Sequence, residues 1–192
     1  MNDPMHFPPR PTWLAQNLLR GAIHAGDIVI DATAGNGHDT VFLADLVGEA
    51  GRVLAFDIQA TAIEETRRKL EEAHLDSRVE LFQKSHARMA GHAAAGSVSA
   101  IMFNLGYLPG ADHELTTSDS ETLTAIAVSE SLLKSGGILS IVCYPGHPAG
   151  AVEAAKVEEW LTSRTPDGWR VGKYAMLGTL RPAPYLLIGR KP

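Results

Sequence analysis

Short polar segments, each directly after an apolar run, carry most of the residues in this sequence that could bind a ligand or move a proton. Asp31 opens the segment DATAGNGHDT, Asp57 stands in FDIQ, Asn104 in FNLGYLPG and Tyr144 in CYPGHPAG. If the apolar runs are parallel strands, these segments meet at one edge of a sheet, where open α/β sheets bind their ligands. The sequence therefore predicts one binding site assembled from several chain segments.

The first of these segments is a glycine turn followed by the start of a helix. Gly35 and Gly37 let the backbone approach a ligand, and free N–H groups at the helix start can hold an anion such as the carboxylate of S-adenosyl-L-methionine. Asp57 follows about twenty residues later, where a carboxylate can accept hydrogen bonds from ribose hydroxyls. A tight structural turn would explain the glycines equally well. A dinucleotide-dependent oxidoreductase would also have a glycine turn and an acidic residue at this distance. Its glycine-rich motif, however, has a third small residue at the position of Thr40.

Other residues near these segments extend the expected cofactor site. Asp39 opens the helix after the turn, where its charge can offset the helix dipole or contact the methionine amino group. Ser85 and His86 follow the third expected strand, where the adenine ring of such a cofactor is usually held, although a lone His is more often a polar loop residue. The residues predicted to bind the cofactor are Asp31, Gly35, Asn36, Gly37, Asp39, Thr40, Asp57, Gln59, Ser85 and His86.

The segment after the fourth expected strand suggests an amine as the acceptor. Asn104-Leu105-Gly106-Tyr107 is similar to the N-P-P-Y element of methyltransferases that alkylate exocyclic or side-chain nitrogens, with Leu-Gly in place of the two prolines. That similarity implies that Asn104 orients the amine and that Tyr107 stacks on or borders the base.

The CYPGHPAG segment places two further candidates at the same sheet edge. Tyr144 and His147 follow the fifth expected strand, and His147 could accept the proton that the amine loses, since the unperturbed imidazole pKa is near neutrality. A rigid Pro/Gly turn with a solvated His is the competing interpretation. The predicted catalytic residues are Asn104, Tyr107, Tyr144 and His147, and no metal ligands are predicted.

Alternating strand-like and helix-like runs must position these residues. A helix with Thr12 as its N-cap is expected at about 12–24, before the first strand, and the segment Ser120–Lys134 is expected to be helical and to stop at Gly136–Gly137. Two final runs lie too close together for a crossover helix and predict an antiparallel hairpin at about 169–190. The expected strands are Asp27–Ala32, Arg52–Asp57, Val79–Gln83, Ala100–Asn104, Ile138–Cys143, Trp169–Ala175 and Tyr185–Gly189; the other expected helices are Asp39–Leu46, Ala60–Ala73 and about 151–161.

This order predicts an α/β fold with a doubly wound, mostly parallel seven-stranded sheet whose C-terminal strand is antiparallel, which is the Rossmann-like layout of class I methyltransferases. The 192 residues, 45% of them hydrophobic, suit a single domain over residues 1–192. One cysteine, Cys143, excludes an internal disulfide and a multi-cysteine metal site. Without a recognisable signal peptide or membrane segment, a cytoplasmic protein is expected.

The formal net charge of −5 argues against a broadly basic nucleic-acid binder, but the charge is uneven along the chain. Residues 164–192 contain six Lys and Arg against a single acidic residue, Asp167. Arg164, Arg170, Lys173 and Arg181 are therefore the predicted phosphate contacts for an RNA partner. A solvated C-terminal face is the alternative explanation.

Taken together, DATAGNGHDT, FDIQ, FNLGYLPG, CYPGHPAG and APYLL resemble the tRNA 5-(aminomethyl)-2-thiouridine methyltransferases, long labelled "putative rRNA methylases". The resemblance extends from Thr12 to Gly189. It implies S-adenosyl-L-methionine as methyl donor, the aminomethyl group of the wobble uridine in the tRNA anticodon region as acceptor, and RNA contacts made by the rim of the domain or shared across a homodimer. The alternatives are methylation of rRNA or of a small amine, an NAD-dependent oxidoreductase, and a non-catalytic cofactor-binding subunit.

Overall fold

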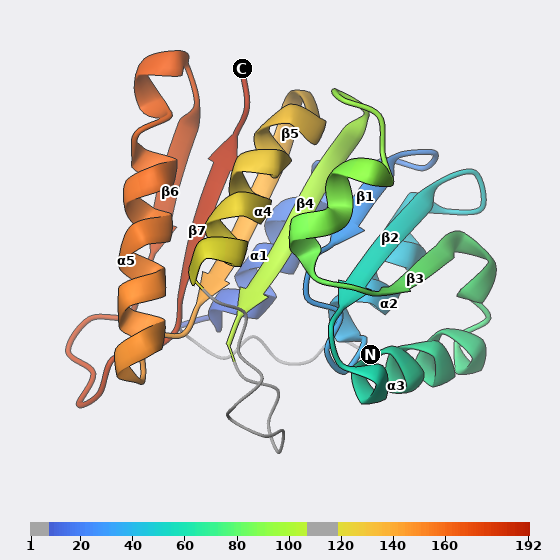
Figure 1. The fold of residues 1–192 in the computed structure, drawn as a ribbon, viewed down its shortest axis with the longest axis horizontal. Helices are drawn as coiled ribbons and strands as arrows, with labels where there is room; N and C mark the ends of the chain where they lie inside the picture. Colours follow the sequence, from blue (N-terminus) through green and yellow to red (C-terminus); the bar gives the residue numbers. More distant parts are fainter. Residues whose placement is uncertain (1–7, 107–118) are drawn as a thin grey trace.

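The computed structural model describes residues 8–106 and 119–192, and within them the chain forms one seven-stranded sheet (Figure 1). The strand order is β3-β2-β1-β4-β5-β7-β6, and β7 runs antiparallel to both of its neighbours while the other pairs are parallel. The predicted doubly wound sheet with its antiparallel hairpin is confirmed. The strands are β1 (Ile28–Asp31), β2 (Arg52–Asp57), β3 (Val79–Gln83), β4 (Val98–Leu105), β5 (Leu133–Cys143), β6 (Arg170–Tyr174) and β7 (Tyr185–Arg190).

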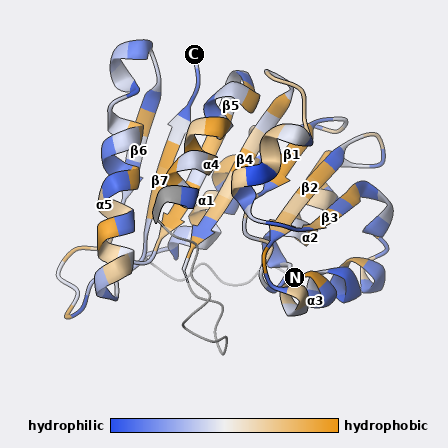
Figure 2. Cartoon of the chain, in the orientation of Figure 1, coloured by the Kyte–Doolittle hydropathy of each residue, from blue (hydrophilic) through white to orange (hydrophobic). Residues whose placement is uncertain are grey.

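Helices cover both faces of the sheet, so the molecule has three layers (Figure 1). Alternate strand residues supply the two cores: Val29 packs on the side of α1, α2 and α3, and its neighbour Ile30 packs on the side of α4 and α5. Figure 2 shows the resulting apolar strands beside helices that carry both polar and apolar residues. The helices are α1 (Pro11–Arg20), α2 (His38–Val47), α3 (Ala60–Glu72), α4 (Asp119–Leu132) and α5 (Pro148–Thr162), with short 3-10 turns η1 (Asp76–Arg78), η2 (His86–Gly91) and η3 (Thr165–Asp167). None of the helices in the described ranges is long and apolar enough to cross a membrane.

The central position of β1 decides where a ligand can bind. Its neighbours are β2 on one side and β4 on the other, so the strand order reverses at β1 and the following loops diverge to opposite faces. Backbone hydrogen bonds continue past the strand end, from Ala32 N to Met102 O and from Ala34 N to Phe56 O, both 2.9 Å. The segment after β1 is thus held between the ends of β2 and β4.

The boundary between α4 and β5 differs from the expectation of a helix that continues to Lys134 and stops at the two glycines. The helix ends at Leu132, and β5 already begins at Leu133, which pairs with Val98 before the register shifts. Gly136, at φ +74°, lies inside this irregular strand start. The Lys191 ammonium donates to the carbonyls of Glu130, in the last turn of the helix, and of Leu133, the first residue of β5, at 2.7 and 2.8 Å, so a side chain near the C-terminus satisfies carbonyls on both sides of this boundary.

The N-terminal helix also begins and ends earlier than expected. Pro11 occupies its first turn, where a fixed φ suits a helix start and no N–H is needed, and Thr12 is therefore inside the helix and not its N-cap. The helix ends at Arg20. Ala15 and Leu19 are fully buried in the core on the α1 side of the sheet, which fixes the helix beside β5 and β7.

Candidate active site

The glycine turn after β1 has the backbone geometry that its sequence predicts. Gly35 and Gly37 have φ of +51° and +77°, in the left-handed region that glycine tolerates. A Cβ on Gly37 would lie 2.9 Å from Thr66 Cα, so α3 passes too close for any side chain. The same helix holds the turn by hydrogen bonds, from Thr66 Oγ1 to Gly35 O (3.2 Å) and from Lys69 Nζ to Asn36 O (2.7 Å).

Asp57 joins the glycine turn to the end of β2. One carboxylate oxygen accepts from Gly35 N and the other accepts from Gln59 N, both at 2.9 Å. A carboxylate can accept about four hydrogen bonds, so each oxygen keeps capacity toward a ligand. The side chain therefore shapes the turn and can still accept hydrogen bonds from ribose hydroxyls.

Asp31 lies fully buried beneath the turn. It accepts hydrogen bonds from Thr33 N (3.1 Å) and from Thr40 Oγ1 (2.6 Å), so Asp31 and Thr40 hold each other inside the protein. Burial, and after it the nearby negative charge of Asp39, raise the pKa of Asp31 to about 7.

This raised pKa predicts how stability depends on pH. Between about pH 4 and pH 7 the folded chain retains a proton on Asp31 that the unfolded chain has lost, so stability falls as the pH rises through this window. Asp31→Asn preserves the acceptor for Thr33 N and supplies a donor for Thr40. We expect it to stabilise the cofactor-free protein on the order of 2 kcal/mol at pH 8 and not at pH 4, measured by urea denaturation at both pH values. An equal effect at both pH values would contradict this assignment.

Asn104 stands at the end of β4, directly beside the glycine turn. Its backbone N–H donates to Thr33 Oγ1 (2.7 Å), and its side-chain Nδ2 donates to Asp39 Oδ2. The other side-chain atom, Oδ1, is buried without a hydrogen-bond partner among the described residues. A buried amide oxygen without a partner is costly, and it is satisfied when a ligand supplies an N–H or O–H at this point.

Tyr144 brings the end of β5 to the same place. A Cβ on Gly106 would lie 2.9 Å from the Tyr144 ring, so the ring packs directly on the segment that follows Asn104. Burial raises the pKa of Tyr144, and the negative charge of Asp39 raises it further, so the phenol stays protonated at neutral pH. The predicted neighbour Tyr107 lies outside the described residues.

His147 has a structural role at the start of α5. Its Nδ1 accepts from Gly150 N at 3.0 Å, which makes it the N-cap of the helix. Beside this capping role, the role of His147 as proton acceptor stays a prediction.

Ser85 and His86 lie at the start of η2. Ser85 caps that turn by accepting from Ala87 N (3.3 Å). His86 is buried, and its Nδ1 lies 3.1 Å from Ala32 O, so Nδ1 carries the proton. Burial lowers the pKa of His86, which keeps the ring neutral. His86 thus supports the segment after β1, and Ser85 supports η2. The Nε2 of His86 has no partner among the described residues, so His86 retains a buried acceptor.

Four residues take part in the site without having been singled out from the sequence: Gln16, Thr33, Thr66 and Lys69. Thr33 lies within the glycine segment, so the motif itself could have indicated it. Thr66 and Lys69 face the turn from α3, and their spacing of three positions places them on one face of that helix. Gln16 donates to Asp39 Oδ1 at 2.6 Å, and nothing in the sequence around it indicates this contact.

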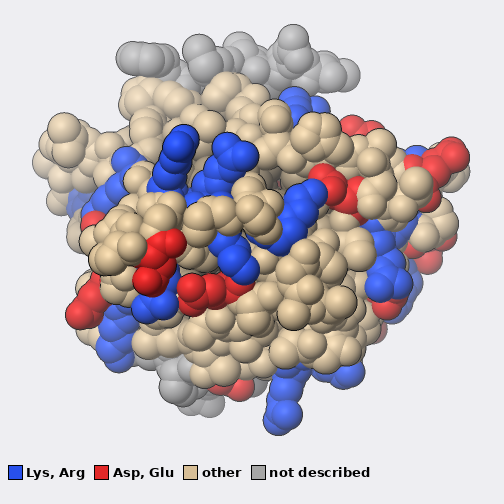
Figure 3. Space-filling view, turned by 90° about the horizontal axis from the view of Figure 1, so that it is seen from above, with Lys and Arg blue, Asp and Glu red and all other residues tan. Residues whose placement is uncertain are grey.

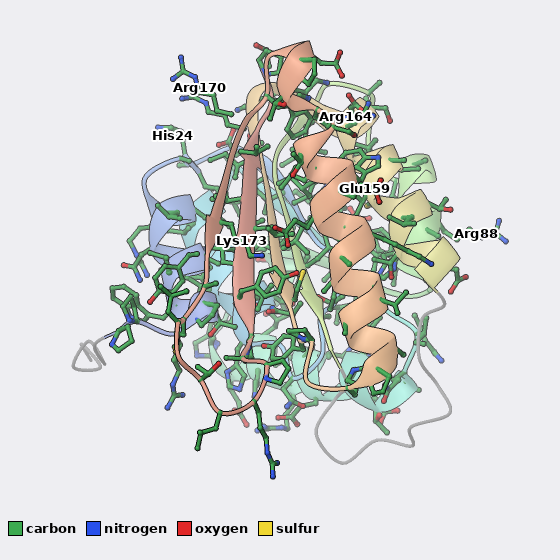
Figure 4. The ribbon with its side chains drawn as sticks, turned by 90° about the vertical axis from the view of Figure 1, so that its left-hand side faces the viewer. His24, Arg88, Glu159, Arg164, Arg170 and Lys173 are labelled. Atoms are coloured by element: carbon green, nitrogen blue, oxygen red, sulfur yellow. The ribbon has the colours of Figure 1, made fainter. Side chains whose placement is uncertain are left out.

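The basic C-terminal segment, which holds the predicted phosphate contacts, does not gather at this site. Arg170 pairs in register with Arg190, which pairs with Ile138 near the amino end of β5, whereas Asn104 and Cys143 mark the opposite edge of the sheet. Figure 4 shows Arg164 and Arg170 near the same end of the molecule and Lys173 about midway along the hairpin.

Some of these cations also form ion pairs with acidic side chains. Arg164 is bound to Glu130 at 3.4 Å, and Lys173 is bound to Glu158 at 2.7 Å. Figure 3, which views the end away from the site, shows Lys and Arg side chains interspersed with Asp and Glu. Arg181 differs, because it lies in the exposed connection 175–184 between β6 and β7 at the edge where β5 ends. That connection passes beside the YPGH segment, with Pro182 O 3.8 Å from the position of a Cβ on Gly146.

Comparison with known proteins gives consistent matches. The family described as "Putative rRNA methylase" matches residues 53–190. A protein of Arabidopsis thaliana named "tRNA (mnm(5)s(2)U34)-methyltransferase, chloroplastic" is 38% identical over 177 residues, which is 88% of this chain and 65% of the Arabidopsis protein. The chain thus spans about two thirds of the length of that relative.

Two solved structures are similar over nearly their whole length. A "putative rRNA-methylase" from Clostridium thermocellum is 38% identical with a TM-score of 0.91, covering 95% of this chain and 98% of that one. A "putative methyltransferase" from Streptococcus mutans, crystallised in complex with SAH, is 34% identical with a TM-score of 0.86 and covers the same shares.

Proposed function

The chain belongs to the family described as "Putative rRNA methylase", and we propose that it is an S-adenosyl-L-methionine-dependent methyltransferase that N-methylates the 5-aminomethyl group of (2-thio)uridine at the tRNA wobble position. The observation that carries this proposal is the buried, unpartnered Oδ1 of Asn104 beside the glycine turn. The name of the Arabidopsis relative supports the acceptor, and SAH, the demethylated product of the donor, in the Streptococcus mutans structure supports the cofactor.

The residues around the glycine turn fit this cofactor. The left-handed glycines open the backbone, the first turn of α2 presents free N–H groups to a carboxylate, and Asp57 has acceptor capacity for ribose hydroxyls. Asp39 and Asp57 supply negative charge at a site that must hold a sulfonium and an ammonium group. When bound, the cofactor supplies an electrophilic methyl group: the amine lone pair forms the new N–C bond, the C–S bond breaks with its electrons going to sulfur, and a proton leaves the resulting ammonium.

Asn104 binds and orients the acceptor amine in this proposal. Its Oδ1 accepts an N–H from the amine, which orients the nitrogen lone pair and satisfies an oxygen that is otherwise buried without a partner. Tyr144 borders the same space as a neutral phenol, so it adds no negative charge that would stabilise a protonated amine.

Mass spectrometry of modified nucleosides tests the proposal directly. The protein is incubated with methyl-labelled S-adenosyl-L-methionine and tRNA that carries the 5-aminomethyl group, and digested nucleosides are separated. We expect labelled 5-methylaminomethyl-(2-thio)uridine and no product with tRNA that lacks the aminomethyl group. If labelled product forms on rRNA or on a free amine instead, the acceptor is rRNA or a small amine and not the tRNA wobble uridine. Calorimetric binding of NAD in place of S-adenosyl-L-methionine would indicate an oxidoreductase, and cofactor binding without turnover on any RNA pool would indicate a non-catalytic subunit.

The position of Arg181 predicts which basic residue contacts the tRNA. Charge reversal in Arg181→Glu should weaken tRNA binding by about 3–10-fold at low salt, because the residue is exposed on the site edge of the sheet. Arg170→Glu is the matched control, since Arg170 is equally exposed but lies at the opposite edge. Filter binding at two salt concentrations measures both. Equal weakening by both variants would mean that proximity to the site does not select the contact.

A further inference from the structure

We propose that Gln16, on the N-terminal helix, is a positioning residue for methyl transfer: through Asp39 it fixes the Asn104 side chain with its oxygen toward the acceptor amine. The inference rests on the proposed function for the identity of the acceptor. It concerns a residue that is not itself among the expected cofactor-binding or catalytic residues, and that acts through two other side chains, Asp39 and Asn104.

Three side chains from three elements form one hydrogen-bonded chain. Gln16 Nε2 of α1 donates to Asp39 Oδ1 at 2.6 Å, and Asn104 Nδ2 of β4 donates to Asp39 Oδ2. Asp39, in the first turn of α2, is only 9% exposed, so water competes little for these bonds. Hydrogen bonds to an ionised carboxylate are shorter and stronger than those between neutral groups.

The carboxylate in the middle determines which way both amides face. A carboxylate only accepts hydrogen bonds, so Asn104 must turn its NH₂ toward Asp39 and its oxygen away. That oxygen is the buried atom without a partner among the described residues. Without the carboxylate, the two ends of the Asn104 amide have nearly the same shape, and a rotation by half a turn would present N–H donors to the amine in place of the acceptor.

Gln16 restricts the rotation of the Asp39 carboxylate. The torsion that rotates an Asp carboxylate is broad, so one bond to Asn104 leaves its plane loosely defined. The bond from Gln16 anchors the second oxygen. Gln16 is held in turn by a rigid helix, because its neighbours Ala15 and Leu19 are fully buried. The Tyr174 hydroxyl also donates to Pro9 O at 2.9 Å, which ties the chain just before α1 to β6.

Steady-state kinetics of Gln16→Met test the role. Met has similar length but cannot donate to Asp39. We expect kcat to fall about 10–100-fold, with the Kd of S-adenosyl-L-methionine and the KM for tRNA within about twofold of the wild-type values, because only the amine alignment is lost. Asn17→Ala is the control on the same helix, since Asn17 is exposed and, within the described ranges, its side chain bonds only Trp13 O of its own helix. An unchanged kcat overturns the proposal, and a weakened cofactor Kd with unchanged kcat would make Gln16 a cofactor ligand.

A double-mutant cycle separates positioning from general structural support. If Gln16 acts through Asn104, then Gln16→Met has no further effect on residual kcat in an Asn104→Ala background. If Gln16 only stabilises the fold, the two effects multiply. Multiplication therefore contradicts the proposal even when the single variant is slow.

An NMR measurement makes failure of this proposal distinguishable from failure of the proposed function. In protein labelled with ¹⁵N-Asn, the side-chain NH₂ of Asn104 is assigned by its absence in Asn104→Ala, with no substrate present. We expect slow solvent exchange of this NH₂ in the wild type and exchange at least tenfold faster in Gln16→Met, with no change in Asn17→Ala. Unchanged exchange overturns the positioning role even if tRNA is methylated. If the exchange rates change as expected but the protein does not methylate tRNA, the hydrogen-bonded chain is supported and only the identity of the acceptor is refuted.

Discussion

Asn104→Ala should lower kcat for methyl transfer by about 10²–10³-fold while leaving the affinity for S-adenosyl-L-methionine within about twofold, the loss being comparable to removal of one well-placed hydrogen-bonding group from an active site. The substitution removes the buried Oδ1 that accepts the amine N–H, and it leaves Asp57 and the glycine turn intact. Steady-state kinetics measure kcat, and calorimetry on the same preparation measures the affinity for the cofactor.

Two features of this experiment keep it specific. Ser97→Ala serves as the matched control, because Ser97 directly precedes β4, is half-buried, and among the described residues its hydroxyl bonds only Ala94 O. Asn104→Ala also removes one donor from Asp39, so the thermal midpoint is measured to confirm that the variant is folded. A variant that keeps its turnover, or one whose cofactor affinity falls as far as its turnover, would contradict the role of Asn104 in binding the acceptor.

Gly37→Ala should weaken S-adenosyl-L-methionine binding at least about 100-fold and destabilise the protein by about 2–4 kcal/mol. A left-handed backbone costs a non-glycine residue about 1–2 kcal/mol, and the new Cβ would lie 2.9 Å from Thr66 Cα, a backbone atom that cannot move alone. The shift needed to relieve this contact displaces the turn and the N–H groups of α2 that face the cofactor. Calorimetry at 10 °C and urea denaturation measure the two effects below the melting range.

Gly96→Ala measures separately how much a left-handed backbone conformation contributes to the loss of stability. Gly96 has a similar φ of +70°, but nothing lies within 4 Å of its Cβ position, and it precedes β4 at the edge of the sheet away from the site. We expect a loss of about 1 kcal/mol and unchanged cofactor affinity. If Gly96→Ala and Gly37→Ala are equally destabilising and both bind the cofactor normally, the close approach of α3 to the turn has no functional consequence.

Much of the fold could be predicted from the sequence because its signals are local. The apolar run of β2 and the glycines of the turn after β1 each depend on neighbouring residues, so β2 has its predicted bounds and Gly37 has the φ that the turn requires. The prediction that α4 continues to Lys134 is wrong for two reasons. Leu133 pairs with Val98 as part of β5, and Lys191, near the C-terminus, donates to the Glu130 carbonyl in the last turn of the helix. A propensity rule cannot anticipate either contact.

The site divides in the same way. Strand periodicity and strand order, which are readable from the residues alone, place the glycine turn, Asp57 and Asn104 at the edge where β1 ends. Packing of helices against the sheet brings Gln16 to Asp39 and Asp39 to Asn104, and it places Arg170 far from the site and Arg181 near it. Gln16 and Asp39 are 23 positions apart in the chain, and Asp39 and Asn104 are 65 apart, so no local pattern records either hydrogen bond.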